Sequence, residues 1–210
     1  MIREHLSRVA VVPVITIHDA GRAAPLAEAL CGGGLSVLEV TLRSPAALAA
    51  IAAMRRAVPD ALVGAGTVVT REQLAAAVAA GSQFLVSPGF SAALAADASA
   101  AGVPLLPGIA TPTELMAALA AGFDTLKFFP AEQAGGIPML KALHAPFPGV
   151  AFCPTGGISA QKAPEYLAQP NVVAVGMSSV APPDLIASGD FDAIGRLARA
   201  ASALRSRGGG

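Results

Sequence analysis

Short apolar runs alternate with longer helical segments along almost the whole chain. The runs are rich in β-branched residues and lack polar alternation, which predicts buried strands covered on both faces, as in a parallel sheet. The predicted strands lie at residues 9–15, 35–41, 61–64, 83–86, 103–106, 125–130, 150–153 and 172–175. Because each run is followed by a segment that favours a helix, eight strands are expected to alternate with eight helices.

Capping residues and glycines mark where the predicted helices begin and end. Helix starts are predicted at Asp19, Ser44, Thr70, Ser91, Thr111, Ser159 and Asp190. A short opening helix is expected within residues 1–8, and a further helix is expected at residues 137–144. Three helices end in an Ala-Gly pair just before a strand, at Gly81, Gly102 and Gly122.

This succession of short units predicts an α/β fold with a single domain, a closed (β/α)8 TIM barrel. The units are roughly 20–25 residues long, near the lower limit for a strand–helix–strand repeat. An open doubly wound sheet is the alternative, but six strands in an open sheet would leave two units without a place. No segment resembles a linker, so we expect the domain to span residues 1–204 and residues 205–210 to form a frayed, disordered tail.

The composition favours a large core and argues against several kinds of partner. Hydrophobic residues make up 54% of the chain and charged residues 13%, and 14 basic side chains balance 14 acidic ones. This balance gives no electrostatic reason to expect nucleic acid or an anionic membrane as a partner. The apolar run from Val9 to Ile17 contains Pro13 and is too short to span a bilayer.

The cysteines and histidines bear on compartment and metal binding. Cys31 and Cys153 lie far apart, which is typical of thiols in a reducing cytoplasm rather than of a disulfide framework. The three histidines are scattered and no CxxC motif is present, so we expect no metal site. The N-terminus lacks the pattern of a signal peptide, and a cytoplasmic location is therefore expected.

A lysine, Lys127, lies inside the apolar and aromatic run at residues 125–130. Alternation along a strand places Lys127 and Phe129 on one face. A buried, unpaired ammonium is costly and tends to release its proton, and the neutral amine is a nucleophile that forms a Schiff base with a carbonyl substrate. The alternative is a structural lysine that pairs with a carboxylate or extends its ammonium to solvent.

Polar residues also gather where the second predicted strand ends. Alternation places Glu39, Thr41 and Arg43 on one face of this strand, and barrel active sites lie at such C-terminal strand ends. As an isolated pair, Glu39 and Arg43 would do no more than neutralise each other. If they face the buried Lys127 across a barrel, the three residues instead indicate a functional site.

Glycine-containing loops follow several predicted strands. The loop at residues 64–67 would let the backbone approach a ligand closely, although an ordinary turn has the same composition. Gly156 and Gly157 precede a predicted helix start, where free backbone N–H groups bind anions. Together with the loop at residues 175–179 they indicate a phosphorylated ligand, with plain turns as the alternative.

Five motifs at these strand ends resemble those of the 2-keto-3-deoxy-6-phosphogluconate (KDPG) aldolases, a class I aldolase family that also includes enzymes acting on 4-hydroxy-2-oxoglutarate (KHG). The motifs are Leu38-Glu39-Val40-Thr41-Leu42-Arg43, Val63-Gly64-Ala65-Gly66-Thr67, Ser87-Pro88-Gly89, Lys127-Phe128-Phe129-Pro130-Ala131-Glu132 and Phe152-Cys153-Pro154-Thr155-Gly156-Gly157-Ile158. They occur in the order of the family, in a match that runs from about Val12 to about Arg199.

The resemblance implies cleavage of a phosphorylated 2-keto acid to pyruvate and glyceraldehyde 3-phosphate in the Entner–Doudoroff pathway. It implies that Lys127 forms the Schiff base and that Glu39 transfers protons. It further implies that Arg43 and Thr67 bind the pyruvyl carboxylate. The remaining implied binding residues are Phe129 and Thr155 in the same pocket, and Gly156, Gly157 and Ser178 at the phosphate. The family is usually homotrimeric and needs no metal or other cofactor.

One departure from the family lies after the last predicted strand. A Gly-Gly-Ser-Trp-like phrase is common there, whereas this chain has Gly176-Met177-Ser178-Ser179. The change bears on phosphate binding and so on the preferred aldehyde. The alternatives are an aldolase acting on KHG or on a galactonate-derived 2-keto-3-deoxy acid, and a barrel scaffold without catalysis. Composition by itself allows a monomer as well as a trimer.

Overall fold

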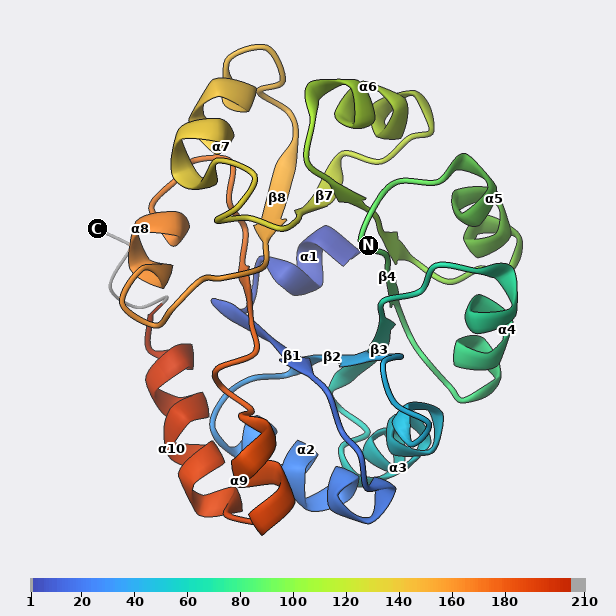
Figure 1. Ribbon diagram of the computed structural model, residues 1–210, viewed down its shortest axis with the longest axis vertical. Coiled ribbons are helices and arrows are strands. Elements are labelled where there is room, and N and C mark those ends of the chain that lie inside the picture. The colour runs from blue at the N-terminus through green and yellow to red at the C-terminus, as the bar shows by residue number, and fades with distance from the viewer. Residues whose placement is uncertain (1, 205–210) are drawn as a thin grey trace.

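Parallel strands curl around the centre of the molecule, and helices form an outer layer around them (Figure 1). The computed structural model describes residues 2–204. The strands are β1 (Val11–Ile15), β2 (Val37–Thr41), β3 (Leu62–Gly66), β4 (Leu85–Val86), β5 (Leu105–Leu106), β6 (Gly108–Ile109), β7 (Thr125–Phe128), β8 (Ala151–Pro154) and β9 (Val175–Met177). One sheet has the order β5-β4-β3-β2-β1-β9, and a second has the order β6-β7-β8.

The two sheets are linked at both ends. Only Pro107 separates β5 from β6, so a single run of chain contributes to both sheets. On the other side, parallel bridges join Phe152 to Val172 and Thr155 to Gly176. The paired strands are all parallel, as predicted, and they form a curled, half-barrel sheet in a single α/β domain.

The helices of the described chain comprise α-helices and one 3-10 helix, and all but α1 lie outside the curl of strands. They are α1 (Ile2–Leu6), a 3-10 helix (Ala20–Arg22), α2 (Ala23–Gly32), α3 (Ala47–Ala57), α4 (Arg71–Ala79), α5 (Ala92–Ala100), α6 (Pro112–Ala120), α7 (Gly136–His144), α8 (Ala163–Leu167), α9 (Pro183–Ser188) and α10 (Phe191–Ser202). Between residues 2 and 204, none of these helices combines the length and apolar character needed to cross a membrane. The tail expected at residues 205–210 lies outside the described residues.

Most predicted helix starts are confirmed by side-chain caps. Side-chain oxygens accept from a backbone N–H of the following turn at Asp19, Thr70, Ser91, Thr111 and Asp190. The prediction at Ser44 was wrong, because its hydroxyl donates to the carbonyl of Ile17 and α3 begins after Ala46 without a side-chain cap. The Ser159 prediction was also wrong, since α8 begins only at Ala163.

The helix count also differs from the prediction. The segment after the last strand forms α9 before α10, and no separate start was predicted for α9. Pro182 lies at the N-terminal boundary of this helix, and no side chain caps it. Most of the other helix starts were predicted from capping side chains, so this helix lacked the signal that was used.

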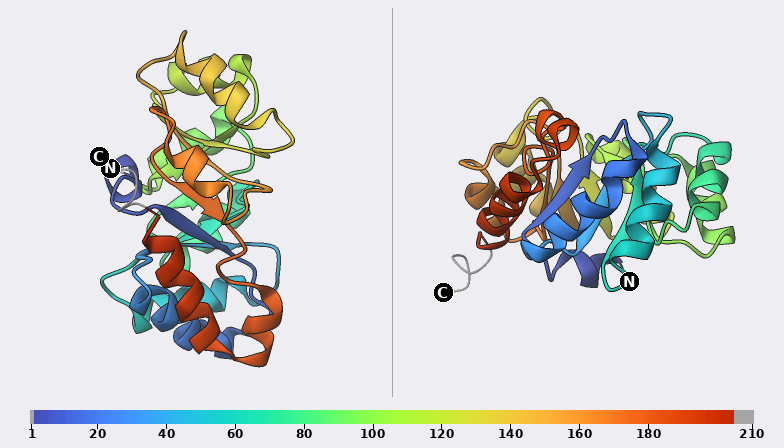
Figure 2. Two further views of the ribbon diagram at one scale, coloured as in Figure 1. Left: turned by 90° about the vertical axis from the view of Figure 1, so that its left-hand side faces the viewer. Right: turned by 90° about the horizontal axis from the view of Figure 1, so that it is seen from below.

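The hydrophobic core has two parts, which separate the scaffold from the interior of the curl. The larger part lies between the strands and the outer helices. The smaller part contains Leu6, Val9, Val12, Val37, Phe84, Val86, Leu106, Cys153 and Ala174. Leu6 belongs to α1, which lies within the curl in Figure 1 and at one end of it in Figure 2. Apolar residues and α1 therefore close the end of the curl at which the strands begin.

Glu114 completes a capping box at the start of α6. Its carboxylate accepts from the N–H groups of Ala110 at 2.7 Å and Thr111 at 2.9 Å, and the Thr111 hydroxyl accepts from the Glu114 N–H at 3.3 Å. The hydrogen bond from Ala110, followed by those from Thr111, lowers the pKa of Glu114 from its ordinary 4.5 because it favours the ionised carboxylate.

We expect Glu114→Gln to be less stable than the parent protein at neutral pH, with a difference that shrinks on acidification. A carboxyl group whose pKa is lowered by folding stabilises the fold above its unfolded-state pKa and loses that contribution as the pH falls through its folded-state pKa. Urea denaturation from about pH 7 down to about pH 3 measures the difference. Glu28→Gln, at an exposed site on α2, corrects for the general loss of a carboxylate. A difference that grows on acidification would contradict the prediction.

Candidate active site

A buried ion pair crosses the interior of the curl. Lys127 Nζ lies 3.1 Å from Glu39 Oε1, and the two side chains are 7% and 3% exposed. Lys127 comes from β7 and Glu39 from β2, which belong to different sheets and are not neighbours. The curl of the chain therefore brings these two predicted residues together. A buried pair of this kind is interdependent, because removing one partner leaves the other charge unpaired and poorly solvated.

Glycine makes room for the Glu39 side chain. Gly66 lies at the end of β3, the neighbour of β2, and a Cβ placed on it would lie 2.2 Å from Glu39 Oε1. Since atoms cannot approach so closely, any side chain at this position would displace the carboxylate. The Gly-Ala-Gly-Thr motif therefore gives space to a side chain of the protein itself, in addition to any space that it leaves for a ligand.

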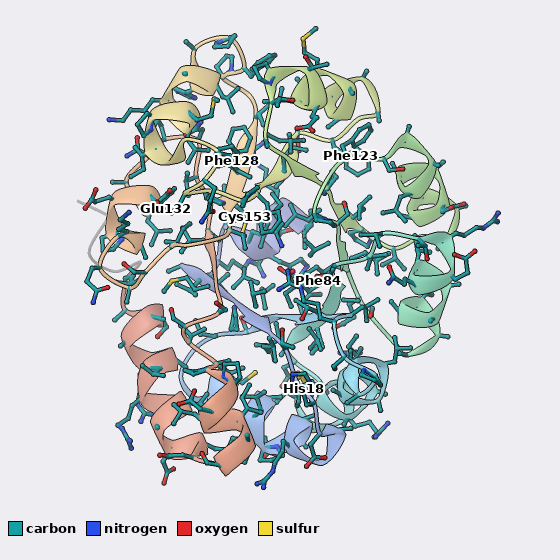
Figure 3. The ribbon with its side chains drawn as sticks, viewed as in Figure 1. His18, Phe84, Phe123, Phe128, Glu132 and Cys153 are labelled. Atoms are coloured by element: carbon teal, nitrogen blue, oxygen red, sulfur yellow. The ribbon has the colours of Figure 1, made fainter. Side chains whose placement is uncertain are left out.

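An aromatic ring and a thiol flank the lysine. The Phe129 ring is half-buried, with its centroid 5.2 Å from Lys127 Nζ, within range of a cation–π interaction when the amine is charged. Cys153 is the β8 register partner of Lys127. Burial raises the pKa of Cys153 to about 12, although the nearby Lys127 charge opposes this, so the thiol is uncharged at neutral pH. Figure 3 shows Cys153 and Phe84 inside the ring of strands.

The sequence did not predict that Cys153 lies beside the lysine. This residue was used only as an indication of a reducing cytoplasm. Alternation was the signal that could have found it, because Cys153 and Thr155 share one face of the β8 segment. Thr155 is buried, and its hydroxyl donates to the Cys153 carbonyl at 3.3 Å. A Cβ on Gly176 would lie 2.2 Å from Thr155 Oγ1, so this glycine makes room for the threonine.

Two threonines lie near the open end of β2. The Thr41 hydroxyl, fully buried, donates to the Ile15 carbonyl at 2.9 Å and lies 2.8 Å from the Thr16 hydroxyl. A hydroxyl has one proton to donate, so Thr16 is the donor to Thr41. This hydrogen-bonded pair holds the end of β2 against β1, beyond Glu39 in the direction of the mouth. The sequence singled out Thr41 but not Thr16.

The other predicted substrate contacts lie in the turns after the strands. Arg43 lies two residues beyond β2 with an exposed side chain, and Thr67 follows β3 directly. Thr67 has φ 61°, a left-handed conformation that costs a non-glycine residue of the order of 1–3 kcal/mol and often marks a functional constraint. Because Thr41 and Gly66 are register partners, the two turns leave the same edge of the sheet side by side.

Comparison with known proteins identifies the family. The sequence matches the family described as KDPG and KHG aldolase over residues 2–197. A 2-dehydro-3-deoxy-phosphogluconate aldolase from Pseudoalteromonas atlantica is 50% identical over 193 residues, which cover 92% of this chain and 90% of that relative. The chain belongs to the KDPG and KHG aldolase family. The resemblance inferred from the five motifs is thereby confirmed, and the protein is a lyase of the aldolase type.

Two solved structures agree with this KDPG and KHG aldolase assignment. A KDPG aldolase from Legionella pneumophila, with pyruvate captured at low pH as a covalent carbinolamine intermediate, is 46% identical with a TM-score of 0.93, and the alignment covers 96% of this chain and 98% of the other. The enzyme of Zymomonas mobilis ZM4, with 3-phosphoglycerate, is 48% identical with a TM-score of 0.89, covering 96% and 95%.

The glycine turn of this KDPG and KHG aldolase lies at the open end of β8. Gly156 and Gly157 have φ values of 108° and 76°, which explains the glycine at both positions. Ser178 is exposed directly after β9, and the bridge between Thr155 and Gly176 brings the two strand ends together. Because α8 begins later than predicted, the turn does not lead directly into a helix, and a helix N-terminus gives no support to the predicted anion site.

The arrangement supports chemistry that needs an amine and a mobile proton. Lys127 Nζ and Glu39 lie within hydrogen-bond distance, so a proton can pass between them and leave an uncharged amine in a largely apolar site. Among residues 2–204, His, Cys, Asp and Glu side chains form no group of three that could hold a metal ion. The functional groups described at this site are an amine, a carboxylate, a thiol, a guanidinium, hydroxyls and backbone amides.

We expect Gly66→Ala to move the Glu39 carboxylate away from Lys127 and to slow aldol cleavage. The loss should be roughly 10²–10⁴-fold, the range for a lost general acid–base group, and Glu39→Gln should show a similar loss. Gly89→Ala is the matched control in another loop, because no atom lies within 4 Å of a Cβ placed there. Pyruvate release by the purified variants measures the effect, with circular dichroism to check folding. Full activity of a folded Gly66→Ala protein would contradict the role given to this glycine.

Proposed function

We propose that this protein is a class I aldolase that cleaves KDPG, also called 2-dehydro-3-deoxy-6-phosphogluconate, to pyruvate and glyceraldehyde 3-phosphate. The observation that carries the proposal is the buried pair of Lys127 and Glu39 at 3.1 Å. It occurs in a chain that is 50% identical to a relative named for this activity. This reaction belongs to the Entner–Doudoroff pathway.

In the proposed reaction, Lys127 is the nucleophile. Its ammonium passes a proton to Glu39, and the neutral amine attacks the C2 carbonyl of the substrate to form a carbinolamine. Glu39 returns that proton to the carbinolamine hydroxyl, which leaves as water and gives a protonated imine. The imine accepts the electron pair of the breaking C3–C4 bond. The Legionella pneumophila relative holds pyruvate as a carbinolamine, which supports attack by an amine in this family.

Glu39 is the proposed acid–base group. Once it is ionised again, it takes the proton of the C4 hydroxyl, the C3–C4 bond breaks, and the aldehyde leaves behind an enamine of pyruvate. The same carboxyl then protonates C3 of the enamine, and hydrolysis of the imine releases pyruvate and regenerates Lys127. Burial of Glu39 at 3% exposure keeps bulk water from competing for these protons.

We assign the substrate carboxylate to Arg43 and Thr67. Both lie at the edge where β2 and β3 end, and a guanidinium can hold a carboxylate through two parallel hydrogen bonds. We also assign Phe129 and Thr155 to this binding site, since the centroid of the Phe129 ring lies 5.2 Å from Lys127 Nζ and Thr155 is buried at the end of β8. The left-handed backbone of Thr67 supports a binding role, because its strain is offset if the conformation presents a group to substrate.

We assign the substrate phosphate to Gly156, Gly157 and Ser178. The turns after β8 and β9 meet at the Thr155–Gly176 bridge, and a related structure contains 3-phosphoglycerate. The Met177 side chain is buried in the outer hydrophobic core, so this departure from the family does not obstruct the mouth. This placement favours KDPG over the unphosphorylated KHG, which remains the alternative substrate.

We further propose that the strands close into one (β/α)8 barrel within a domain spanning residues 1–204. Closure is supported by the single residue between β5 and β6 and by the bridges between β8 and the β9 region. The homotrimeric state and cytoplasmic location are proposals drawn from the family resemblance and the cysteine usage. The partner is a small phosphorylated keto acid, with no part for nucleic acid, membrane, metal or cofactor.

A substrate panel tests the proposed function. We expect kcat/KM for KDPG to exceed the values for KHG and for dephosphorylated KDPG by at least about tenfold, because the phosphate adds charge-assisted hydrogen bonds. Pyruvate release, coupled to lactate dehydrogenase, measures all three reactions. A higher kcat/KM for KHG would assign the alternative substrate, and release of pyruvate from none of the three would indicate a scaffold without catalysis.

A trapping experiment tests the nucleophile. Incubation with pyruvate and sodium borohydride should reduce the imine and attach pyruvate stably to Lys127, because only a neutral amine forms the imine. Mass spectrometry of peptides locates the adduct. Lys127→Met should prevent labelling, whereas Lys141→Met, at an exposed site on α7, should not. An adduct on a different lysine would remove Lys127 from its role.

A further inference from the structure

Glu132 joins the chain after β7 to the α8 region through two side-chain hydrogen bonds. Its Oε1 accepts from the Tyr166 hydroxyl at 2.5 Å, and its Oε2 accepts from the Lys162 ammonium. Tyr166 is only 1% exposed, so its ring is a fixed anchor, whereas the other two side chains reach the surface. Figure 3 shows Glu132 beside α8, apart from the interior of the curl.

The protonation states of this network match its hydrogen bonds. The hydrogen bond from Lys162, followed by that from Tyr166, lowers the pKa of Glu132. Burial, followed by the hydrogen bond to Glu132, raises the pKa of Tyr166. At neutral pH the carboxylate is therefore ionised and the phenol protonated, which is the combination that a charge-assisted hydrogen bond requires.

Glu132 also touches the glycine turn after β8. Its N–H donates to the Gly156 carbonyl at 3.1 Å, and the N–H of Ala131 donates to the Thr155 carbonyl at 2.8 Å. A Cβ on Gly157 would lie 3.0 Å from both Cβ and Cγ of Glu132. The turn thus packs closely on the backbone and the side-chain stem of Glu132.

Tyr166 closes the arrangement from the other side. It belongs to α8, the helix that follows the glycine turn in the chain. Gly136 leaves room for its hydroxyl, since a Cβ on this glycine would lie 3.1 Å from it. Because the ring of Tyr166 is buried, its hydroxyl is a fixed partner for the Glu132 carboxylate, and Glu132 in turn contacts the turn.

We propose that Glu132, held by Tyr166 and Lys162, is a positioning residue that fixes the Gly156–Gly157 turn and thereby sets the affinity for the phosphate end of the substrate. This inference rests on the proposed function, because it concerns the same site. Within the described residues, Glu132 is hydrogen-bonded to the turn, to Lys162 and to Tyr166, whereas Lys127 and Glu39 bond to each other. Substitutions in this network should therefore change the affinity for the substrate phosphate without changing the reaction at the Lys127 amine.

Steady-state kinetics of Glu132→Gln and Tyr166→Phe test the inference. Both substitutions keep the shape of the side chain and weaken or remove the hydrogen bond between residues 132 and 166. We expect KM for KDPG to rise by about tenfold in each variant, the size of effect of one lost hydrogen bond to a charged group, with kcat within about twofold of the parent. The kinetics of dephosphorylated KDPG and the borohydride trapping of pyruvate should be unchanged.

Glu165→Gln provides the matched control. It removes one carboxylate from α8, directly beside Tyr166, at an exposed position. Its KM for KDPG should equal that of the parent protein. An unchanged KM in both test variants would overturn the inference. So would an equal loss with the phosphorylated and dephosphorylated substrates, because that pattern indicates general damage to the site.

Hydrogen exchange supplies a readout that needs no substrate. The amides of Ala131 and Glu132 donate to the turn, so their exchange reports directly on the contact. In Tyr166→Phe these amides should exchange about tenfold faster than in the parent or in Glu165→Gln. If the parent protein does not prefer KDPG to dephosphorylated KDPG, the proposed function is contradicted. If the exchange rates of the two amides are unchanged in Tyr166→Phe, only the positioning role of Glu132 is overturned.

Discussion

The buried pair of Lys127 and Glu39 is the constraint on which the rest of the site depends. Two charged groups are held 3.1 Å apart and almost out of contact with solvent, so each is stabilised chiefly by the other. They come from strands in different sheets, and the pair exists only because the chain curls. In the proposed reaction, the same pairing lets a proton pass from the amine to the carboxylate before the Schiff base forms.

The interior of the curl has an apolar end, which is closed, and a polar end, where the candidate site lies. Leu6 of α1 and the surrounding apolar side chains fill the end at which the strands begin. Toward the opposite end, small residues make room for polar ones: Gly66 lies against Glu39, and Gly176 lies against Thr155. Glu39 and Thr155 therefore occupy places where a neighbouring glycine leaves space for them, and Cys153, the register partner of Lys127, belongs to the apolar cluster with an uncharged thiol.

Strand positions and most helix starts could be predicted, because they depend on nearby residues. Two of the differences occurred where a residue paired with a partner distant in the sequence. Ser44 had the composition of a cap, yet its hydroxyl donates to Ile17 on another element. The run predicted at residues 103–106 extends past Pro107 into β6, because pairing with β7 continues the ladder. Local propensity contains no information on such partners, so only the assembled sheet decides them.

The sequence by itself determined the family, the order of the strands and which residue types lie at their ends, because alternation and motifs act over a few residues. Only the tertiary structure decided that Glu39 pairs with Lys127, 88 residues away, while Arg43 remains exposed. It also decided the left-handed backbone of Thr67 and the anchoring of Glu132 by Tyr166. The reason is geometric: distances between remote residues follow from the curl and register of the sheet, which the whole chain sets together.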